Sequence, residues 1–246
     1  FGLNTKSDDG TLAGSINFYS TTWNDRIETR YVQNENGDDD ILYLTGINQV
    51  HTGIETEFAA QINEMFRLDI GLSLGNWSYA DDATGTYRDS DGSEQSYSYA
   101  LKDLRIGDAP QASANFGLTA SPVEGSAIQI SYRYYDLYWS DWSPTSREYT
   151  AGDGQPGPDR RKSWRVPAYG ICDLNASYDL PFEFRGANPQ VVLNIRNLFD
   201  AVYVQDALDN SRYNARPFRV NDHSANAAEV YMGMPTTFNL GLKINF

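Results

Sequence analysis

Eight segments of the chain alternate large apolar residues with polar ones, and residues 237–246 show the pattern most clearly. Phe238, Leu240, Leu242 and Ile244 take every second position there, before the terminal aromatic residue. Because successive side chains of a β-strand point to opposite sides, each segment predicts a strand with one apolar and one polar face. The other seven segments begin near Leu12, Val50, Phe66, Ala112, Ile128, Cys172 and Val191.

The connectors between the predicted strands alternate between long and short. Outer-membrane β-barrels show the same rhythm, because short turns close one end of the barrel and long loops the other. Each segment also has roughly the 9 to 11 residues that a tilted strand needs to cross a bilayer. The long connectors contain residues 34–40, 81–108, 143–165 and 205–235, and the short ones are residues 61–65, 121–125 and 181–189.

A transmembrane antiparallel β-barrel and a soluble β-sandwich both fit this alternation, because they differ only in what surrounds the apolar face. The heavy load of 17 tyrosines, 11 phenylalanines and 5 tryptophans favours the barrel. Barrels place aromatic residues in girdles at the two membrane interfaces. The predicted girdle residues at strand ends beside the long connectors are Trp23, Trp77, Tyr79, Tyr138, Trp139, Trp142, Trp164, Tyr169 and Tyr203.

Charge and composition exclude several functions. A formal net charge of −14 makes nucleic acid an unsuitable partner, because phosphates would be repelled. Cys172 is the only cysteine, so neither an intrachain disulfide nor a cysteine-based zinc site can form. The sequence contains no Gly-x-Ser-x-Gly motif and no evident Ser-His-Asp set. We therefore expect no enzymatic activity.

One acidic stretch resembles half of a calcium-binding loop. Asp89, Asp91 and Glu94 offer carboxylate oxygens around a glycine, but the full spacing and the bidentate glutamate of such loops are missing. We favour an acidic surface loop and no cofactor, with weak calcium binding as the alternative. His51 and His223 are the only histidines and lie on widely separated segments, so a two-histidine metal site is not expected.

Several motifs, in the same order along the chain, resemble those of TonB-dependent outer-membrane receptors. The segment Asn-Ile-Arg-Asn-Leu-Phe-Asp-Ala-Val-Tyr at residues 194–203 is the most specific. Residues 233–238 are similar to the ending of the family, with Thr236 where arginine is common. Weaker similarities are Gly-Ile-Glu-Thr-Glu at residues 53–57, a proline-led strand at 109–115 and Val-Pro-Ala-Tyr at 166–169.

The resemblance implies an all-β chain that forms about the last eight strands of a 22-stranded antiparallel up-and-down barrel. Residues 1–246 are then a single partial domain, the C-terminal portion of the barrel, and the plug domain and TonB box lie outside it. The start at Phe1, without an initiator methionine, agrees with this interpretation. The implied function is active import of a scarce or bulky ligand across the cell outer membrane. Siderophores, cobalamin, oligosaccharides and peptides are the ligand types that the resemblance suggests.

The resemblance also implies partners. The TonB–ExbB–ExbD complex would supply energy through the plug, while outer-membrane lipid and lipopolysaccharide would surround the barrel. Residues predicted to face the lumen and the plug carry charges of both signs, which suits a plug held by polar contacts. A plain solvated lumen wall is the alternative for each of them. They are Glu55, Glu57, Arg67, Asp69, Arg133 and Arg196.

Candidate ligand-binding residues lie in and beside one long connector. Aromatic rings there could stack on a sugar or a siderophore, although a position in the girdle is favoured. A short basic patch could meet an anionic ligand or lipopolysaccharide phosphates, although a solvated charge run is favoured. The aromatic candidates are Tyr138, Trp139, Trp142 and Trp164, and the basic ones are Arg160 and Arg161.

Two other hypotheses remain open. The first is a self-contained eight-stranded outer-membrane barrel with a structural or adhesive role, and the second is a soluble β-sandwich. Upstream sequence separates the first from the transporter, because a plug and about 14 further strands would precede residue 1 only in the transporter. Extraction from the outer membrane by detergent would exclude the sandwich.

Overall fold

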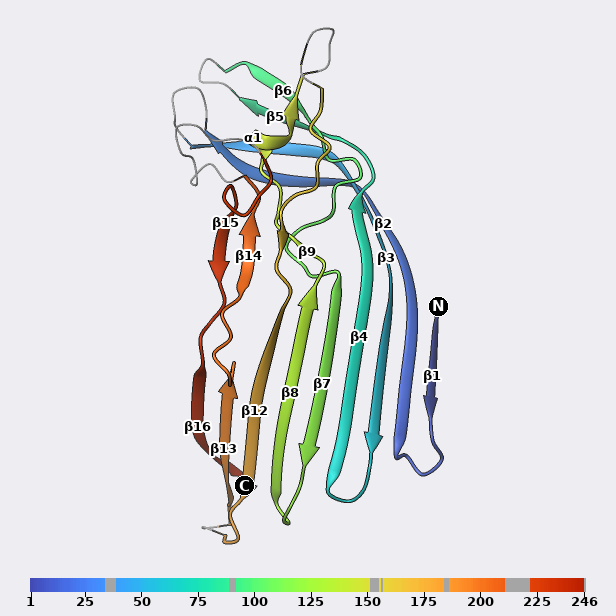
Figure 1. The fold of residues 1–246 in the computed structure, drawn as a ribbon, viewed down its shortest axis with the longest axis vertical. Helices are drawn as coiled ribbons and strands as arrows, with labels where there is room; N and C mark the ends of the chain where they lie inside the picture. The colour runs from blue at the N-terminus through green and yellow to red at the C-terminus, as the bar shows by residue number, and fades with distance from the viewer. Residues whose placement is uncertain are drawn as a thin grey trace.

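The computed structural model describes residues 1–33, 39–88, 92–150, 155, 157–183, 186–210 and 222–245, and its main feature is an antiparallel sheet (Figure 1). Nine strands follow one another across this sheet, which we call the wall. In order they are β1 (Gly2–Lys6), β2 (Leu12–Gln33), β3 (Asp39–Gln61), β4 (Phe66–Tyr79), β7 (Ala112–Ala120), β8 (Ser126–Asp136), β12 (Tyr169–Asp179), β13 (Asn188–Arg196) and β16 (Thr237–Asn245).

The segments above the wall fold into a second unit, which we call the cap (Figure 1). It contains the upper parts of β2 and β3, at residues 26–33 and 39–47, and the short elements between the wall strands. No helix among the described residues is long and apolar enough to cross a membrane. The short elements are β5 (Ala83–Arg88), β6 (Glu94–Tyr99), β9 (Tyr138–Trp139), α1 (Pro144–Arg147), β10 (Glu148–Tyr149), β11 (Arg165–Val166), β14 (Val204–Leu208) and β15 (Glu229–Met232).

The wall confirms the strands that the alternation predicts. The eight segments correspond to β2, β3, β4, β7, β8, β12, β13 and β16, and the structure adds the short β1 beside β2. The short connectors are turns at the lower end in Figure 1, and the long ones build the cap at the upper end. The predicted fold class, an antiparallel barrel wall, is therefore confirmed.

The strands align so that apolar residues form continuous rows across the wall. Because direct cross-strand neighbours share a face, such a row lies on one side of the sheet. Its members are Leu12, Ala60, Leu68, Leu118, Ile130, Leu174, Ile195 and Phe238, one from each strand from β2 to β16.

This apolar face is exposed. Leu74 is 53% exposed, Leu118 44% and Leu240 68%, so no second layer of the described residues covers them. A soluble sandwich would bury such a face against a second sheet, and each large side chain left in water forgoes roughly 1.5–3 kcal/mol of burial. The soluble sandwich is therefore wrong, and a lipid environment is what this face requires.

The cap, in contrast, has a conventional hydrophobic core. Leu42 and Leu44 of β3 are completely buried and pack with Trp142, which is 1% exposed. The upper parts of β2 and β3 reach this core because both strands bend across the top of the wall (Figure 1). The bend coincides with register shifts around Arg26 and with a positive φ of 68° at Gly46, a backbone conformation that glycine adopts without strain.

Candidate functional site

The polar face of the wall collects the charged residues that alternate with the apolar ones. Glu57, Gly71, Asn115 and Arg133 are direct neighbours on β3, β4, β7 and β8, so they share this face. Residues two positions away along a strand share it as well. All six residues predicted to face a lumen therefore lie on it: Glu55, Glu57, Arg67, Asp69, Arg133 and Arg196.

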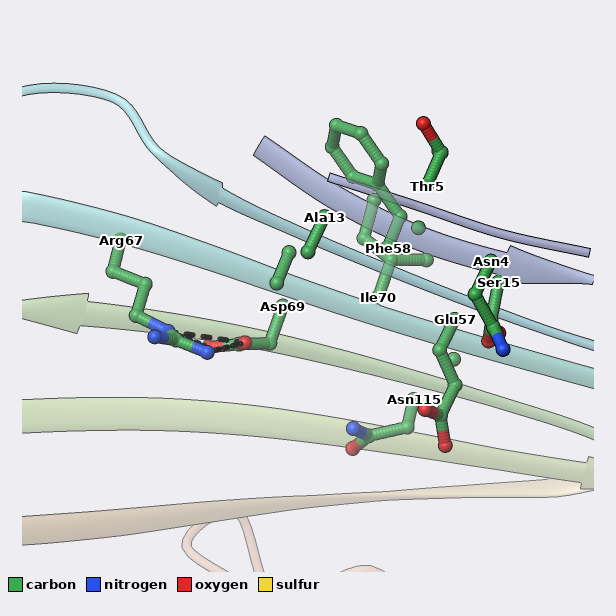
Figure 2. Close-up of a pocket in the computed structure, with 13 residues that line it drawn as sticks. Asn4, Thr5, Ala13, Ser15, Glu57, Phe58, Arg67, Asp69, Ile70 and Asn115 are labelled. Atoms are coloured by element: carbon green, nitrogen blue, oxygen red, sulfur yellow. Dashed lines mark hydrogen bonds and ion pairs between the residues drawn. The ribbon is translucent and has the colours of Figure 1, made fainter. Parts of the chain in front are cut away.

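A first groove of about 480 Å³ lies on this face across β1–β4 and β7 (Figure 2). Within it, Arg67 donates from Nε and Nη2 to the carboxylate of Asp69 at 2.8–3.1 Å. Both side chains are partly exposed, so water screens the pair and its contribution to stability is small. The groove therefore combines one satisfied ion pair with Glu57 and Asn115, whose side chains have no hydrogen bond to the described residues, and this combination suits a polar partner.

A second groove of about 320 Å³ lies on the same face across β8, β12, β13 and the start of β16. One side consists of rings: Tyr169 lies 5.2 Å from Tyr135 and is stacked on Tyr203 at 4.7 Å, measured between ring centroids. The other side is charged, with Arg133 paired to Asp173 and with Arg196 nearby. The positions of Tyr169 and Tyr203 at strand ends predict a membrane girdle. This prediction is wrong, because both rings line the groove.

The segment at residues 194–203 explains how Tyr203 reaches the groove. The side-chain amide of Asn197 donates to the carbonyls of Ala201 and Met234 and accepts from the Ala201 N–H, all at 2.8–3.1 Å. Thr236 donates from Oγ1 to the Asn197 carbonyl at 2.6 Å and from its N–H to Asp200 at 2.9 Å. The buried Asn197 thus ties the end of β13 to the start of β16, and this bracing fixes the loop that carries Tyr203.

A second row of aromatic rings lies on the polar face near the upper end of β2, β3 and β4. His51 stands between Trp23 and Trp77, with ring centroids 4.9 and 5.5 Å away. Trp77 donates from Nε1 to the Tyr19 hydroxyl at 2.8 Å, and the rings need the space left by glycine, since a Cβ on Gly53 would lie 2.3 Å from that hydroxyl. Trp23 and Trp77 are therefore not girdle residues, because their strand phase turns them to the polar face.

The predicted aromatic ligand-binding residues lie mainly inside the cap. Tyr138, Trp139 and Trp142 are 4%, 7% and 1% exposed, and Trp164 is partly buried beside Tyr138. Tyr79, at 3% exposed, also lies in the cap core. Burial removes these residues from a membrane girdle, and ligand stacking by them stays a prediction that would require the cap to open.

The two predicted basic residues are both paired on the cap surface. The side chain of Arg160 forms two hydrogen bonds to the carboxylate of Asp82, and that of Arg161 forms three to the carboxylate of Asp159. The bonds from Arg160 lower the pKa of Asp82 to about 2, and those from Arg161 hold the pKa of Asp159 well below its usual range. An anionic ligand would therefore compete with internal carboxylates at this patch.

A buried ion cluster joins two cap loops. Arg147 and Asp209 are both inaccessible and lie 3.3 Å apart, from Nη2 to Oδ2. Arg147 also donates to the carbonyls of Asp159 and Arg161, and His223 faces Asp209 at 2.5 Å and Asp159 at 3.0 Å. Because each charge has a partner of opposite sign, the cluster is a structural clasp and not an open binding site.

Among the described residues, no group of three or more histidine, cysteine or acidic side chains could hold a metal ion. Asp89 and Asp91 fall outside the described residues, and Glu94 is exposed. Calcium binding there stays a prediction.

Asp108 has a raised pKa. Partial burial of its carboxyl group and the nearby carboxylates of Asp141 and Asp206 raise this pKa to about 7.

Comparison with solved structures shows the same fold in larger proteins. The chain superposes along its whole length on the copper transporter OprC, with a TM-score of 0.60 and 18% identity, and covers 30% of it. For the ferric-catecholate import receptor Fiu from E. coli K12 the values are 0.55 and 17%, with 100% of this chain and 27% of Fiu covered. For FpvAI, in its complex with pyocin S2, they are 0.53 and 15%, with 98% and 26% covered. The chain thus spans less than a third of each neighbour.

Comparison of the sequence itself gives the family. No curated protein matches the chain. The family model described as "TonB dependent receptor-like, beta-barrel" matches residues 1–198, which include β1 to β13 and most of both grooves. In such barrels the apolar face meets lipid and the polar face lines the lumen. The chain therefore belongs to the TonB-dependent receptor-like β-barrel family.

Proposed function

We propose that the chain forms the C-terminal part of the barrel of an outer-membrane receptor, which imports a scarce or bulky ligand with energy supplied through TonB. The observation that carries the proposal is the two-faced wall, with its exposed apolar rows and its grooved polar face. The exposed apolar face suits contact with lipid. The polar face suits the lining of a closed lumen that holds water or polar protein groups.

The open edges of the wall support a larger barrel and disfavour a self-contained eight-stranded one. Among the described residues, β1 pairs only with β2, and β16 pairs only with β13. An unpaired backbone N–H or C=O group in lipid costs several kcal/mol. Further strands therefore close the barrel, in agreement with the much longer solved neighbours.

The polar face suits a lumen that is filled by a plug. Its ion pairs leave partly exposed charges of both signs, so a plug with complementary polar groups can be held there and released again. In this proposal the energy comes from the TonB–ExbB–ExbD complex acting on the plug. Siderophores, cobalamin, oligosaccharides and peptides all remain candidate ligands.

The test is an uptake experiment with the full-length protein in its own cell. We expect the protein in the outer-membrane fraction, and we expect its deletion to abolish uptake of one labelled probe among ferric siderophores, cobalamin and oligosaccharides. Loss of TonB should abolish the same uptake while leaving the protein in the membrane. Uptake that continues without TonB, or an inner-membrane or soluble location, would overturn the proposal.

A further inference from the structure

The second groove has an unbalanced charge, although the chain as a whole is strongly acidic with a net charge of −14. Its ionised side chains are Arg133, Arg196 and Asp173. Asp173 is already satisfied by the protein, since Oδ2 accepts from Arg133 and Oδ1 accepts from the Asn197 N–H at 2.9 Å. One positive charge in the groove is therefore left over.

That charge belongs to Arg196. Within the described residues its guanidinium has no hydrogen bond and no ion pair, and the side chain is exposed on the polar face. An arginine fork in this state offers five N–H donors in a plane, a geometry that matches carboxylate or phosphate oxygens. Charge-assisted hydrogen bonds of this kind are about twice as strong as neutral ones.

The rings beside Arg196 define the rest of the ligand. Tyr135, Tyr169 and Tyr203 are each partly exposed, pack against one another through Tyr169, and line the groove. Tyr203 is held in place with little freedom, because a Cβ on Gly233 would lie 2.0 Å from its ring. A flat ring that packs on such a surface binds about two- to tenfold more tightly than its buried area alone would give.

We propose that this groove is a binding site for an aromatic anion, a planar ring that carries a carboxylate or phosphate group. The anionic group pairs with Arg196, and the ring packs against the tyrosine side chains that line the groove. This site would give the proposed receptor a luminal position for one class of ligand. Its role in transport rests on the proposed function, but binding at the site does not. The volume of about 320 Å³ fits a group of this size.

The test is calorimetric titration of the purified full-length protein in detergent with phenyl phosphate. Inorganic phosphate tests the charge alone, and phenyl β-glucoside tests the ring alone. We expect phenyl phosphate to bind more tightly than either. Arg196→Gln should weaken its binding tenfold or more, and Tyr203→Leu about fivefold. Arg67→Gln is the matched control, because Arg67 lies on the same luminal face in the other groove, and it should leave the affinity unchanged.

Three results would overturn the site. They are equal binding of phenyl phosphate by wild type and Arg196→Gln, binding no tighter than that of inorganic phosphate, and no binding at all. The last result would mean that an acidic group of the protein itself fills the groove. Folding of each variant is checked by heat-dependent electrophoretic mobility. Because binding is measured without uptake, failure of the site and failure of the transport function are distinguishable.

Discussion

In the wall, large apolar side chains face outward, and Phe238 is 78% and Leu118 44% exposed. In the cap, residues of the same types are enclosed, and Leu42, Leu44 and Leu101 are all 0% exposed. One chain thus uses apolar residues in opposite ways within a few tens of residues. The wall is held together by cross-strand hydrogen bonds and leaves its apolar face open, whereas the cap is stabilised by burial from water.

Polar residues show the reverse division. On the wall many polar side chains remain accessible, as in the partly exposed pair of Arg67 and Asp69. In the cap, Arg147 and Asp209 are completely buried and paired. The effect of a substitution should therefore depend on whether it lies in the wall or in the cap. A change of charge should matter most where water is excluded, either by protein in the cap or by lipid around the wall.

The largest effect is expected from Asp209→Asn in the cap. The change leaves the Arg147 charge buried with only the weaker partner Asp159, at 3.9 Å. Breaking a buried pair costs about 3–5 kcal/mol. Hydrogen exchange of residues 138–149 should accelerate strongly, while the wall strands keep their protection.

Asp222→Asn is the control for this prediction, because Asp222 is exposed in the same loop region. We expect its effect to stay within about 0.5 kcal/mol. Equal acceleration in both variants would show that the cap does not depend on its buried clasp. Acceleration throughout the wall would show that cap and wall unfold as one unit.

The next largest effect is expected from a charge on the lipid-facing side of the wall. Phe116→Lys places an ammonium group in the middle of β7 on the apolar face, which costs about 2–4 kcal/mol near the bilayer centre. Asn115→Lys places the same group one residue away on the luminal face, where water and polar groups surround it. Equilibrium folding of the full-length protein into lipid vesicles, titrated with urea, should separate the two variants. Equal losses would break the assignment of the two faces.

The wall was predictable because each strand carries its own signal. The period of two residues is local, so eight strands, their faces and the side of the turns follow from the chain without any tertiary contact. The luminal position of Trp77 was also within reach, because Trp77 continues the phase of Arg67 and Asp69 along β4. The position of Trp77 at a strand end suggests a girdle instead, but the alternation of faces along β4 predicts its side of the sheet correctly.

The cap was not predictable, because its core depends on contacts between distant segments. Leu42 and Leu44 meet Trp142 only after β2 and β3 extend to 22 and 23 residues and bend over the wall. The site at Tyr203 was missed for a related reason. Asn197 and Asp200 have positive φ angles of 51°, so the strand phase cannot be followed through that turn to Tyr203.

A smaller effect is expected from Asp108 in the cap, and its sign follows from its raised pKa of about 7. The folded state holds the proton more tightly than the unfolded state, whose value is near 3.8. The stabilisation is therefore complete below about pH 4 and is lost as the pH rises to about 7. Although neighbouring groups enclose part of the carboxyl group, water still reaches the Asp108 side chain and screens the effect, so we expect about 1 kcal/mol.

Asp108→Asn tests this dependence with little backbone strain, since asparagine also tolerates the positive φ of 62° found at this position. Cap stability of the variant and of wild type, compared at the same pH by hydrogen exchange, should differ above pH 7 and converge near pH 4. The variant should be the more stable one at high pH. A constant difference across this range would contradict the charge-based origin.

The smallest effect is expected from Arg160→Gln, which removes a cap ion pair that water reaches, with side chains 42% and 25% exposed. Such pairs contribute about 0.2–1 kcal/mol. The hydrogen bonds from Arg160 lower the pKa of Asp82 to about 2, so the contribution is present above about pH 4 and is lost as the pH falls towards 2. The variant should raise the pKa of Asp82 towards its usual value of 3.8, so its cap should be less stable than that of wild type above about pH 4 and equally stable near pH 2. Salt at about 1 M should remove most of the difference from wild type, whereas the loss in Asp209→Asn should persist in salt. Equal salt sensitivity of the two variants would break the distinction between the surface and the core of the cap.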